Sequence, residues 1–155
     1  MSATATMTPS DAVRNLRQKG ESMKNDALKV HATFEPGDVS AQGDINIVCI
    51  RKLPETATPR QNRQLADGNT QGSRHVLRDG QVYDCDTTEL HRAILQEAKA
   101  EVPMNLIGPV FTGGSAPAYL EHPEHGHQQF PADAICVVTY QRTLSLQGKE
   151  IRVFD

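Results

Sequence analysis

The sequence predicts a mainly β, α+β fold: an antiparallel β-sandwich or jelly-roll-like barrel with one inserted helix and an N-terminal helical arm. Short runs rich in Val, Ile, Phe and Tyr recur between Gly and Pro turn signals, and a single stretch with helical spacing lies among them. A length of 155 residues suits one domain, and no internal repeat is visible. We therefore expect an arm and linker over residues 1–44 and a single β-rich domain over 45–155.

The arm begins with a helix signal. Ser10 can cap the first turn, and Asp11 favours it electrostatically. An apolar stripe at helical spacing follows, interrupted at Gly20; its larger members are Val13, Leu16, Met23 and Leu28. So polar a helix is marginal alone in water. We therefore expect this stripe to be an interface with another chain.

The body contains four further runs that we expect to be strands. The third is apolar on both faces at its start, which is typical of a central strand covered on both faces. The runs cover residues 45–50, 106–111, 134–142 and 144–154, with a turn at Gln147-Gly148 in the last.

A hairpin is predicted between the first two of these runs. Asp79-Gly80 is a frequent two-residue turn, because Gly tolerates a positive φ. The strands would cover 73–77 and 81–85, and this register places His75 opposite Asp84, where a carboxylate can orient an imidazole. The simplest interpretation of that pair is a cross-strand polar contact.

A helix is predicted over residues 87–101, capped by Thr88 and stopped by Pro103. Before the hairpin lies a long polar loop over residues 54–72. Loops of this length are usually functional or docked on a partner, so we expect Arg60 and Arg63 to be interface residues.

The charge pattern argues against a dedicated nucleic-acid binder, since the net charge is −3. Residues 1–30 hold five basic and three acidic side chains, hence +2, which leaves −5 for the rest. Such an arm can dock on the body of a neighbouring copy. No apolar run is long enough to span a membrane, and the N-terminus lacks the pattern of a secretory signal.

Three widely spaced cysteines predict free thiols in a reducing compartment, because no C-x-x-C pair occurs. Cys49 and Cys136 lie within apolar runs, which predicts that both are buried, whereas Cys85 does not lie in such a run.

The densest set of potential metal ligands is His122, His125 and His127, with His75 as a possible fourth. In an extended segment His125 and His127 would point to one face. The cupin family uses a similar His-x-His on a β-barrel, but its flanking Gly and Glu are absent here. Pro123 and Gly126 favour the other interpretation, a polar turn with structural histidines.

One longer pattern remains: Gln64-Leu65-Ala66-x-Gly68-x-Thr70-x-Gly72-Ser73-Arg74-His75, then Gly108-Pro109, His122-Pro123-Glu124-His125 and Tyr140-Gln141. It resembles small uncharacterised proteins of phage and bacterial genomes and spans residues 45–142. Those proteins tend to have Gly where this chain has Asp133-Ala134. The resemblance implies a phage setting and assigns neither an activity nor catalytic residues.

Two classes of function follow from these observations. The first is a non-enzymatic structural protein, such as a phage capsid decoration or cement subunit, in the virion or the bacterial cytoplasm. Its partners would be copies of itself and a larger assembly, with neither membrane nor nucleic acid, and it would need no cofactor. The alternative is a small cupin-like metal-binding β-barrel that could act as an enzyme and would use the cluster of residues 122–127.

Overall fold

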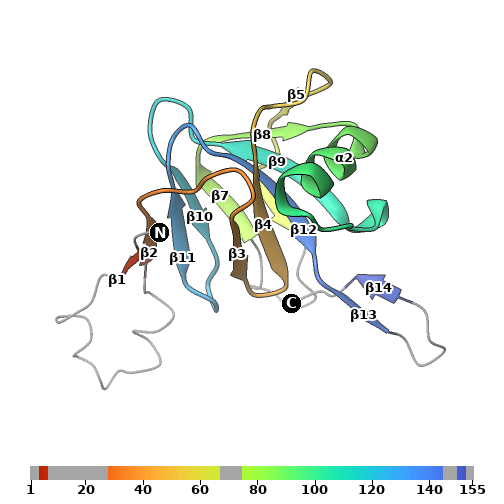
Figure 1. Ribbon diagram of the computed structural model, residues 1–155. Helices are drawn as coiled ribbons and strands as arrows, with labels where there is room; N and C mark the ends of the chain where they lie inside the picture. Colours follow the sequence, from red (N-terminus) through yellow and green to blue (C-terminus); the bar gives the residue numbers. More distant parts are fainter. Residues whose placement is uncertain (1–3, 7–27, 67–74, 145–149, 153–155) are drawn as a thin grey trace.

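The computed structural model describes residues 4–6, 28–66, 75–144 and 150–152 (Figure 1). Over these residues the chain is mainly β, as the sequence predicts, with two large sheets, a small C-terminal pair of strands and the helix α2 (Thr87–Ala98). No helix in the described part of the chain is long and apolar enough to cross a membrane.

Sheet A has six strands among the described residues, in the order β1-β2-β11-β10-β7-β6. All neighbours in it are antiparallel except β2 and β11, which run parallel. Its strands are β1 (Thr4–Thr6), β2 (Leu28–His31), β6 (Gln64–Ala66), β7 (His75–Asp79), β10 (Ala118–Glu121) and β11 (His127–Phe130).

Sheet B also has six described strands, all antiparallel, in the order β3-β4-β12-β9-β8-β5. They are β3 (Val39–Gln42), β4 (Ile45–Ile50), β5 (Thr58–Arg60), β8 (Gln81–Asp84), β9 (Ile107–Thr112) and β12 (Ile135–Tyr140). The short helix η1 (Met104–Leu106) precedes β9, and β13 (Arg142–Leu144) pairs with β14 (Glu150–Arg152) after β12.

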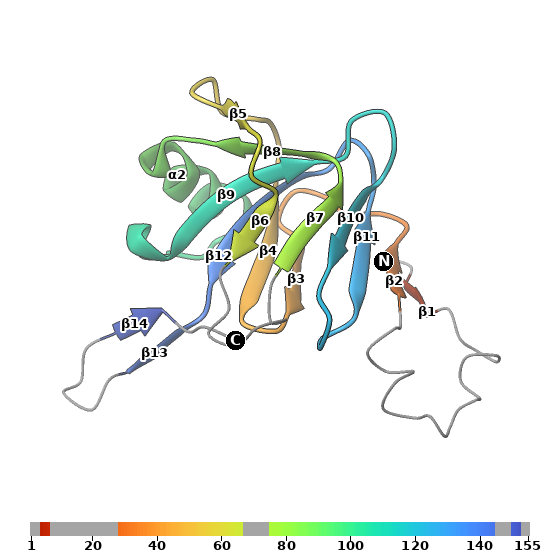
Figure 2. The ribbon, with the colours of Figure 1, turned by 180° about the vertical axis from the view of Figure 1, so that it is seen from behind.

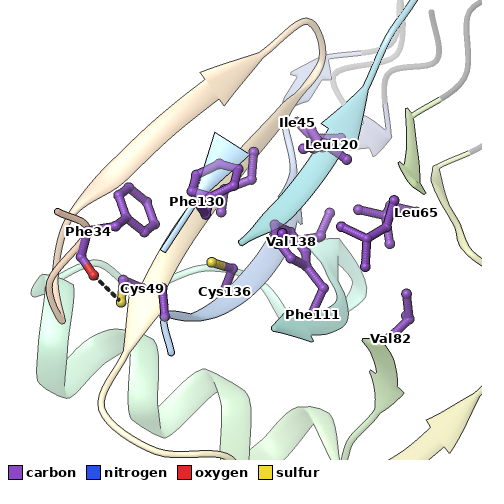
Figure 3. Close-up of a cluster of buried hydrophobic side chains, with 14 of the residues drawn as sticks. Phe34, Ile45, Cys49, Leu65, Val82, Phe111, Leu120, Phe130, Cys136 and Val138 are labelled. Carbon is purple, nitrogen blue, oxygen red and sulfur yellow. Dashed lines mark hydrogen bonds between the residues drawn. The ribbon is translucent and has the colours of Figure 1, made fainter. Parts of the chain in front are cut away.

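The main core lies between the two sheets, which gives a β-sandwich-like arrangement rather than a closed barrel (Figures 2 and 3). Sheet A contributes Leu120 and Phe130, and sheet B contributes Ile47 and Phe111, all fully buried. Phe130 packs edge-on against Phe111, with 5.5 Å between their ring centroids. These large side chains supply the apolar area that stabilises the sandwich.

Sheet B is buried on its other face too, because α2 packs there. Leu90 and Ile94 of the helix meet Val48, Val110 and Val137 in a second core. This double coverage explains why β4 is almost wholly apolar and why β12 is apolar on both faces, as predicted for the central strand over residues 134–142.

The limits of α2 differ from the prediction. Asp86, not Thr88, caps the helix, since its side chain accepts a hydrogen bond from the Thr88 N–H. The helix ends at Ala98 rather than residue 101, because Lys99 adopts a left-handed conformation with φ of 57°.

The predicted hairpin around Asp79-Gly80 is wrong. The strand before the turn, β7, belongs to sheet A, and the strand after it, β8, belongs to sheet B. The chain passes between sheets at Gly80, where φ is 129° and an added Cβ would lie 2.4 Å from the Thr112 carbonyl oxygen. His75 consequently does not face Asp84.

Two further expectations need correction or lie outside the described residues. The loop over 54–72 contains the short strands β5 and β6 and is not devoid of structure. The helix predicted over 10–28 lies outside the described residues except for Leu28, which begins strand β2. Three described segments of the predicted arm and linker, β1, β2 and β3, form part of the sheets.

Candidate functional site

Buried polar side chains gather along one side of the sandwich, where β3 and the β3–β4 turn face strands of sheet A. We call this group the polar seam. Each member is at most 6% exposed. Its members are His31, Ser40, Gln42, Asp44, His75, His122 and Gln128.

His75 lies at the centre of the polar seam and is held at both ring nitrogens. Its Nε2 is 2.7 Å from Asp44 Oδ1, and its Nδ1 is 2.8 Å from Gln42 Oε1. The Gln42 amide is oriented by its Nε2, which donates to the Gly126 carbonyl at 2.8 Å. Gln42 therefore presents its oxygen to the imidazole, so the Nδ1 of His75 carries a proton and donates it.

The Asp44–His75 contact thus holds a second proton between carboxylate and Nε2. A buried pair of this kind needs good geometry and further hydrogen bonds to offset desolvation. The bond to Gln42 supplies one such partner. The arrangement resembles the carboxylate–imidazole half of an acid–base site, but the second ring nitrogen faces an amide and not a nucleophile.

His122 lies against His75, with 4.2 Å between ring centroids, and the exposed His125 lies against His122 at 4.4 Å. The His122 Nδ1 accepts the backbone N–H groups of Glu124 and His125 at 3.0 and 3.1 Å. It thereby shapes the turn between β10 and β11. An accepting Nδ1 uses the lone pair that a metal would require.

The ring of His127 is not part of the stack formed by the rings of His75, His122 and His125. Its Nδ1 accepts the His122 N–H at 3.2 Å, and its ring lies 5.7 Å from the ring of Tyr119. The structure thus brings the rings of His75, His122 and His125 together, whereas the His127 ring contacts the backbone of His122 and the ring of Tyr119. In the part of the chain that the structure describes, no three His, Cys, Asp or Glu side chains are grouped to hold a metal ion.

The second part of the polar seam joins β2, β3 and β11. Gln128 Nε2 donates to the Ala41 carbonyl at 2.7 Å, so its Oε1 accepts from Ser40 Oγ at 2.7 Å and from His31 Nε2 at 2.9 Å. His31 is therefore the Nε2–H tautomer, stacked on Phe130 at 4.7 Å.

The remaining ring nitrogen of His31, Nδ1, is buried and has no hydrogen-bond partner among the described residues. Burial lowers the pKa of His31, against the opposing effect of its hydrogen bond to Gln128. The side chain is thus a neutral ring fitted between Phe34 and Phe130.

Residues 41–138 match the model of a family described as a domain of unknown function, DUF8820. The chain belongs to this family. No curated protein and no solved structure gives a significant match. The resemblance to uncharacterised proteins is confirmed at this level. The DUF8820 segment includes Gln42, Asp44, His75 and His122, whereas His31 and Ser40 precede it.

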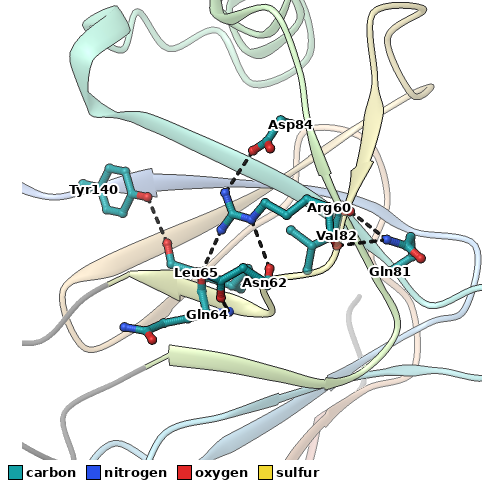
Figure 4. Close-up of polar contacts among 8 residues, drawn as sticks. All are labelled: Arg60, Asn62, Gln64, Leu65, Gln81, Val82, Asp84 and Tyr140. Carbon is teal, nitrogen blue, oxygen red and sulfur yellow. Dashed lines mark hydrogen bonds and ion pairs between the residues drawn. The ribbon is translucent and has the colours of Figure 1, made fainter.

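Two arginines within the DUF8820 segment, predicted as interface residues, bind carbonyls of their own chain. Arg60 donates to Asp84 Oδ1 at 2.9 Å and to the carbonyls of Asn62 and Gln64 (Figure 4). Arg63 donates to the carbonyls of Leu77, Arg78 and Gly80 at 2.6 to 3.1 Å. Arg60 thus holds β5 and β6 together, and Arg63 braces the corner where the chain changes sheets.

The other predicted interface residues are mostly outside the described part of the chain. Val13, Leu16 and Met23 lie outside it, and Leu28 is a half-buried residue of β2. Their interface role stays a prediction.

The thiol prediction is confirmed: all three cysteines are free, with Cys49 and Cys136 buried and Cys85 half-buried. Burial raises the pKa of both Cys49 and Cys85 to about 11, and it raises the pKa of Cys136 well above its ordinary value. Their thiols are protonated at neutral pH.

Most of the polar seam was missed by sequence reasoning. A signal existed in Val39-Ser-Ala-Gln42, where the alternation is reversed. Val39 is 55% exposed, whereas Ser40 and Gln42 point inward. Polar residues at the inward positions of a strand indicate a buried hydrogen-bond network.

Proposed function

We propose that this chain is a non-enzymatic structural protein that acts by association with copies of itself and with a larger assembly, such as a phage capsid. It would serve there as a decoration or cement subunit. The observation that supports this proposal is that the polar side chains of the seam are hydrogen-bonded within the fold. The hydrogen-bonding atoms of Asp44, Gln42 and His75 that would serve chemistry are instead bonded to one another.

A seam of this kind is suited to a rigid scaffold. It ties the β3 side of sheet B to sheet A, because Ser40 and Gln42 of β3 bond to Gln128 and to the Gly126 carbonyl. Buried networks rigidify a core where their members are hydrogen-bonded, and in the described part of this seam only His31 Nδ1 lacks a partner. Rigidity suits a subunit that must present fixed surfaces to its neighbours.

A second supporting feature is the outer face of sheet A. Helix α2 covers the outer face of sheet B only (Figure 1). On the outer face of sheet A the Arg78 guanidinium lies 3.8 Å from the Tyr119 ring centroid and pairs with Glu121 at 2.9 Å. Tyr and Arg are the residues most enriched at the energetic centres of interfaces.

The experiment is a truncation that removes residues 1–27 and keeps β2. Circular dichroism and urea unfolding report the fold, while sedimentation velocity and co-purification with particles report association. We expect a folded protein that no longer associates. A full-length chain that is monomeric and absent from particles would refute the proposal, and so would unchanged association after truncation.

A matched variant distinguishes the effect of removing the arm from the effect of removing its apolar side chains. Replacing Val13 and Leu16 by Ser keeps the arm and removes part of its apolar stripe. We expect this variant to lose association as the truncation does. Loss only on truncation would indicate that β1 or the backbone of the arm, rather than the stripe, makes the contact.

The alternative, a small metal-binding protein, is supported by one observation, the closeness of the rings of His75, His122 and His125. It requires the His122 Nδ1 to give up two backbone N–H groups. Elemental analysis, followed by zinc titration of wild type and His125→Ala, tests it. Stoichiometric metal that the substitution removes would favour this alternative over the structural role.

A further inference from the structure

The pair Cys49 and Cys136 is placed face to face at the centre of sheet B. Cys49 in β4 and Cys136 in β12 are direct partners in the register. The Cys49 N–H donates to the Asp38 carbonyl at 2.9 Å, and its carbonyl accepts from the Gly37 N–H at 2.8 Å. Both groups therefore point toward the β3 side and away from β12.

The direction of the Cys49 N–H and carbonyl determines whether Cys49 and Cys136 form a hydrogen-bonded or a non-hydrogen-bonded pair. In an antiparallel sheet, a residue sends its N–H and carbonyl to the same neighbouring strand, so Cys49 and Cys136 form a non-hydrogen-bonded pair. The Cα atoms of such pairs lie about 4.5 Å apart. Disulfides span Cα separations of roughly 4.4–6.8 Å. The backbone thus already meets the distance that a bond between the two sulfurs requires.

The surroundings make the two thiols unequal. Both lie in the core between the sheets, Cys49 at 2% exposure and Cys136 at 0% (Figure 3). Cys49 lines a cleft of about 260 Å³ between the β2–β3 connection and the β11–β12 turn, together with Phe34 and Ala134. Cys136 does not line this cleft. A small molecule in the cleft therefore reaches Cys49 first.

We propose that Cys49 and Cys136 form a dithiol that a small peroxide, entering through this cleft, converts into a cross-strand disulfide. The Cys49 thiolate attacks one peroxide oxygen, the O–O bond breaks, and water leaves after protonation, which gives a sulfenic acid. Cys136 sulfur then attacks the Cys49 sulfur, the S–O bond breaks, and a second water leaves. Two thiols and one hydrogen peroxide thus yield one disulfide and two waters.

Two local contacts of the Cys49 thiol, to the carbonyls of Phe34 and Ile50, must open for the second step. The Cys49 Sγ donates to the Phe34 carbonyl at 3.3 Å and is held away from its partner (Figure 3). A thiol is a weak donor. Rotation about χ1 of Cys49 breaks these contacts and turns the sulfur toward Cys136.

The pKa values of the two thiols determine the rate of the reaction with peroxide. Burial raises the pKa of Cys49 to about 11, so the reactive thiolate is scarce at neutral pH. The pKa of Cys136 is raised by burial first and by neighbouring Cys49 second. The reaction is therefore slow at pH 7 and accelerates about tenfold for each pH unit below the pKa of Cys49.

The test uses the full chain with Cys85→Ser, so that the half-buried third thiol takes no part. The folded protein is treated with hydrogen peroxide at pH 7 and pH 9, quenched, unfolded, alkylated and analysed by mass spectrometry. We expect loss of two hydrogens, a peptide pair linking positions 49 and 136, and faster conversion at the higher pH. Two alkylated thiols after prolonged treatment would overturn the proposal.

Single variants check the order of events. In Cys136→Ala, dimedone should trap a sulfenic acid at Cys49, whereas in Cys49→Ala the remaining Cys136 should stay reduced. Reaction of Cys136 alone at the same rate would contradict entry through the cleft. Oxidation of the linked pair at the rate of global unfolding would also overturn the proposal, because the bond would then form in the unfolded chain.

Discussion

Replacing Asp44 tests the role of the polar seam most directly. The Asp44→Ala variant removes the partner of His75 Nε2, a group that is 1% exposed at its side chain. His75 must then keep a buried charge without a counterion, or become neutral with an Nε2 lone pair that lacks a donor. Breaking a buried pair of this kind costs about 3–5 kcal/mol of unfolding free energy.

Two matched variants calibrate that loss. Asp84 pairs with Arg60 at the surface, where the Asp84 side chain is 61% exposed, so Asp84→Ala should cost at most about 1 kcal/mol. Asp44→Asn should be intermediate, at about 1–2 kcal/mol, because an amide can rotate to donate to a neutral Nε2.

Urea unfolding followed by circular dichroism measures these differences. With a slope of about 2 kcal/mol per molar urea, Asp44→Ala should lower the midpoint by about 2 M and Asp84→Ala by less than about 0.5 M. Midpoints for the two Ala variants within about 0.5 M of each other would refute the reasoning, since the buried pair would then contribute no more than the exposed one.

Two further predictions follow from single positions. Gly80→Ala should lower the free energy of unfolding by at least about 2 kcal/mol, because the new Cβ would meet the Thr112 carbonyl oxygen at 2.4 Å. Gly114→Ala, at φ of 96° but in open space, is the matched control and should cost only about 1 kcal/mol in urea unfolding. Equal losses of unfolding free energy would show that the close approach of Gly80 to the Thr112 carbonyl adds nothing to the cost of the substitution. The second prediction concerns His31, whose pKa is lowered by burial in the folded state. The unfolded chain therefore binds the extra proton first as pH falls below about 6.5, so the free energy of unfolding declines below that pH. His31→Phe keeps the stacked ring and should flatten this decline in urea midpoints measured from about pH 7 to pH 5. An unchanged slope would contradict the assignment.

The central strands and the helix could be predicted because their patterns record burial. Residues 45–50 are almost wholly apolar, and this reflects real coverage of sheet B on both faces. The spacing of Leu90 and Ile94 likewise reflects the one buried side of α2.

The assignment of strands to sheets around Asp79-Gly80 could not be read from the sequence. Leu77 and Val82 point into the shared core from opposite sheets. A hairpin within one sheet would require the same inward positions, so the apolar alternation is identical in both arrangements. Only the close approach of Gly80 to β9 distinguishes them, and that contact lies far away in the sequence.

The candidate site was only partly predictable for a similar reason. The sequence drew attention to His75 and His122, but not to the partners that determine their protonation. Asp44 directly follows Gly43, and such a pair is typical of a turn rather than of a buried hydrogen-bond partner. Its carboxylate reaches His75 because the β3–β4 turn folds toward sheet A, which no local pattern encodes.

The pairing of β4 with β12 also has a consequence for how the chain folds as it is synthesised. β4 can pair early with β3, its neighbour in sequence, but its other edge has no partner until β12, which follows much later in the sequence. Until then an apolar strand offers an open edge, and distant pairings of this kind close slowly. We therefore expect nascent chains that stop before Tyr140 to need protection from aggregation, and the emergence of β12 to be the event that completes the centre of sheet B.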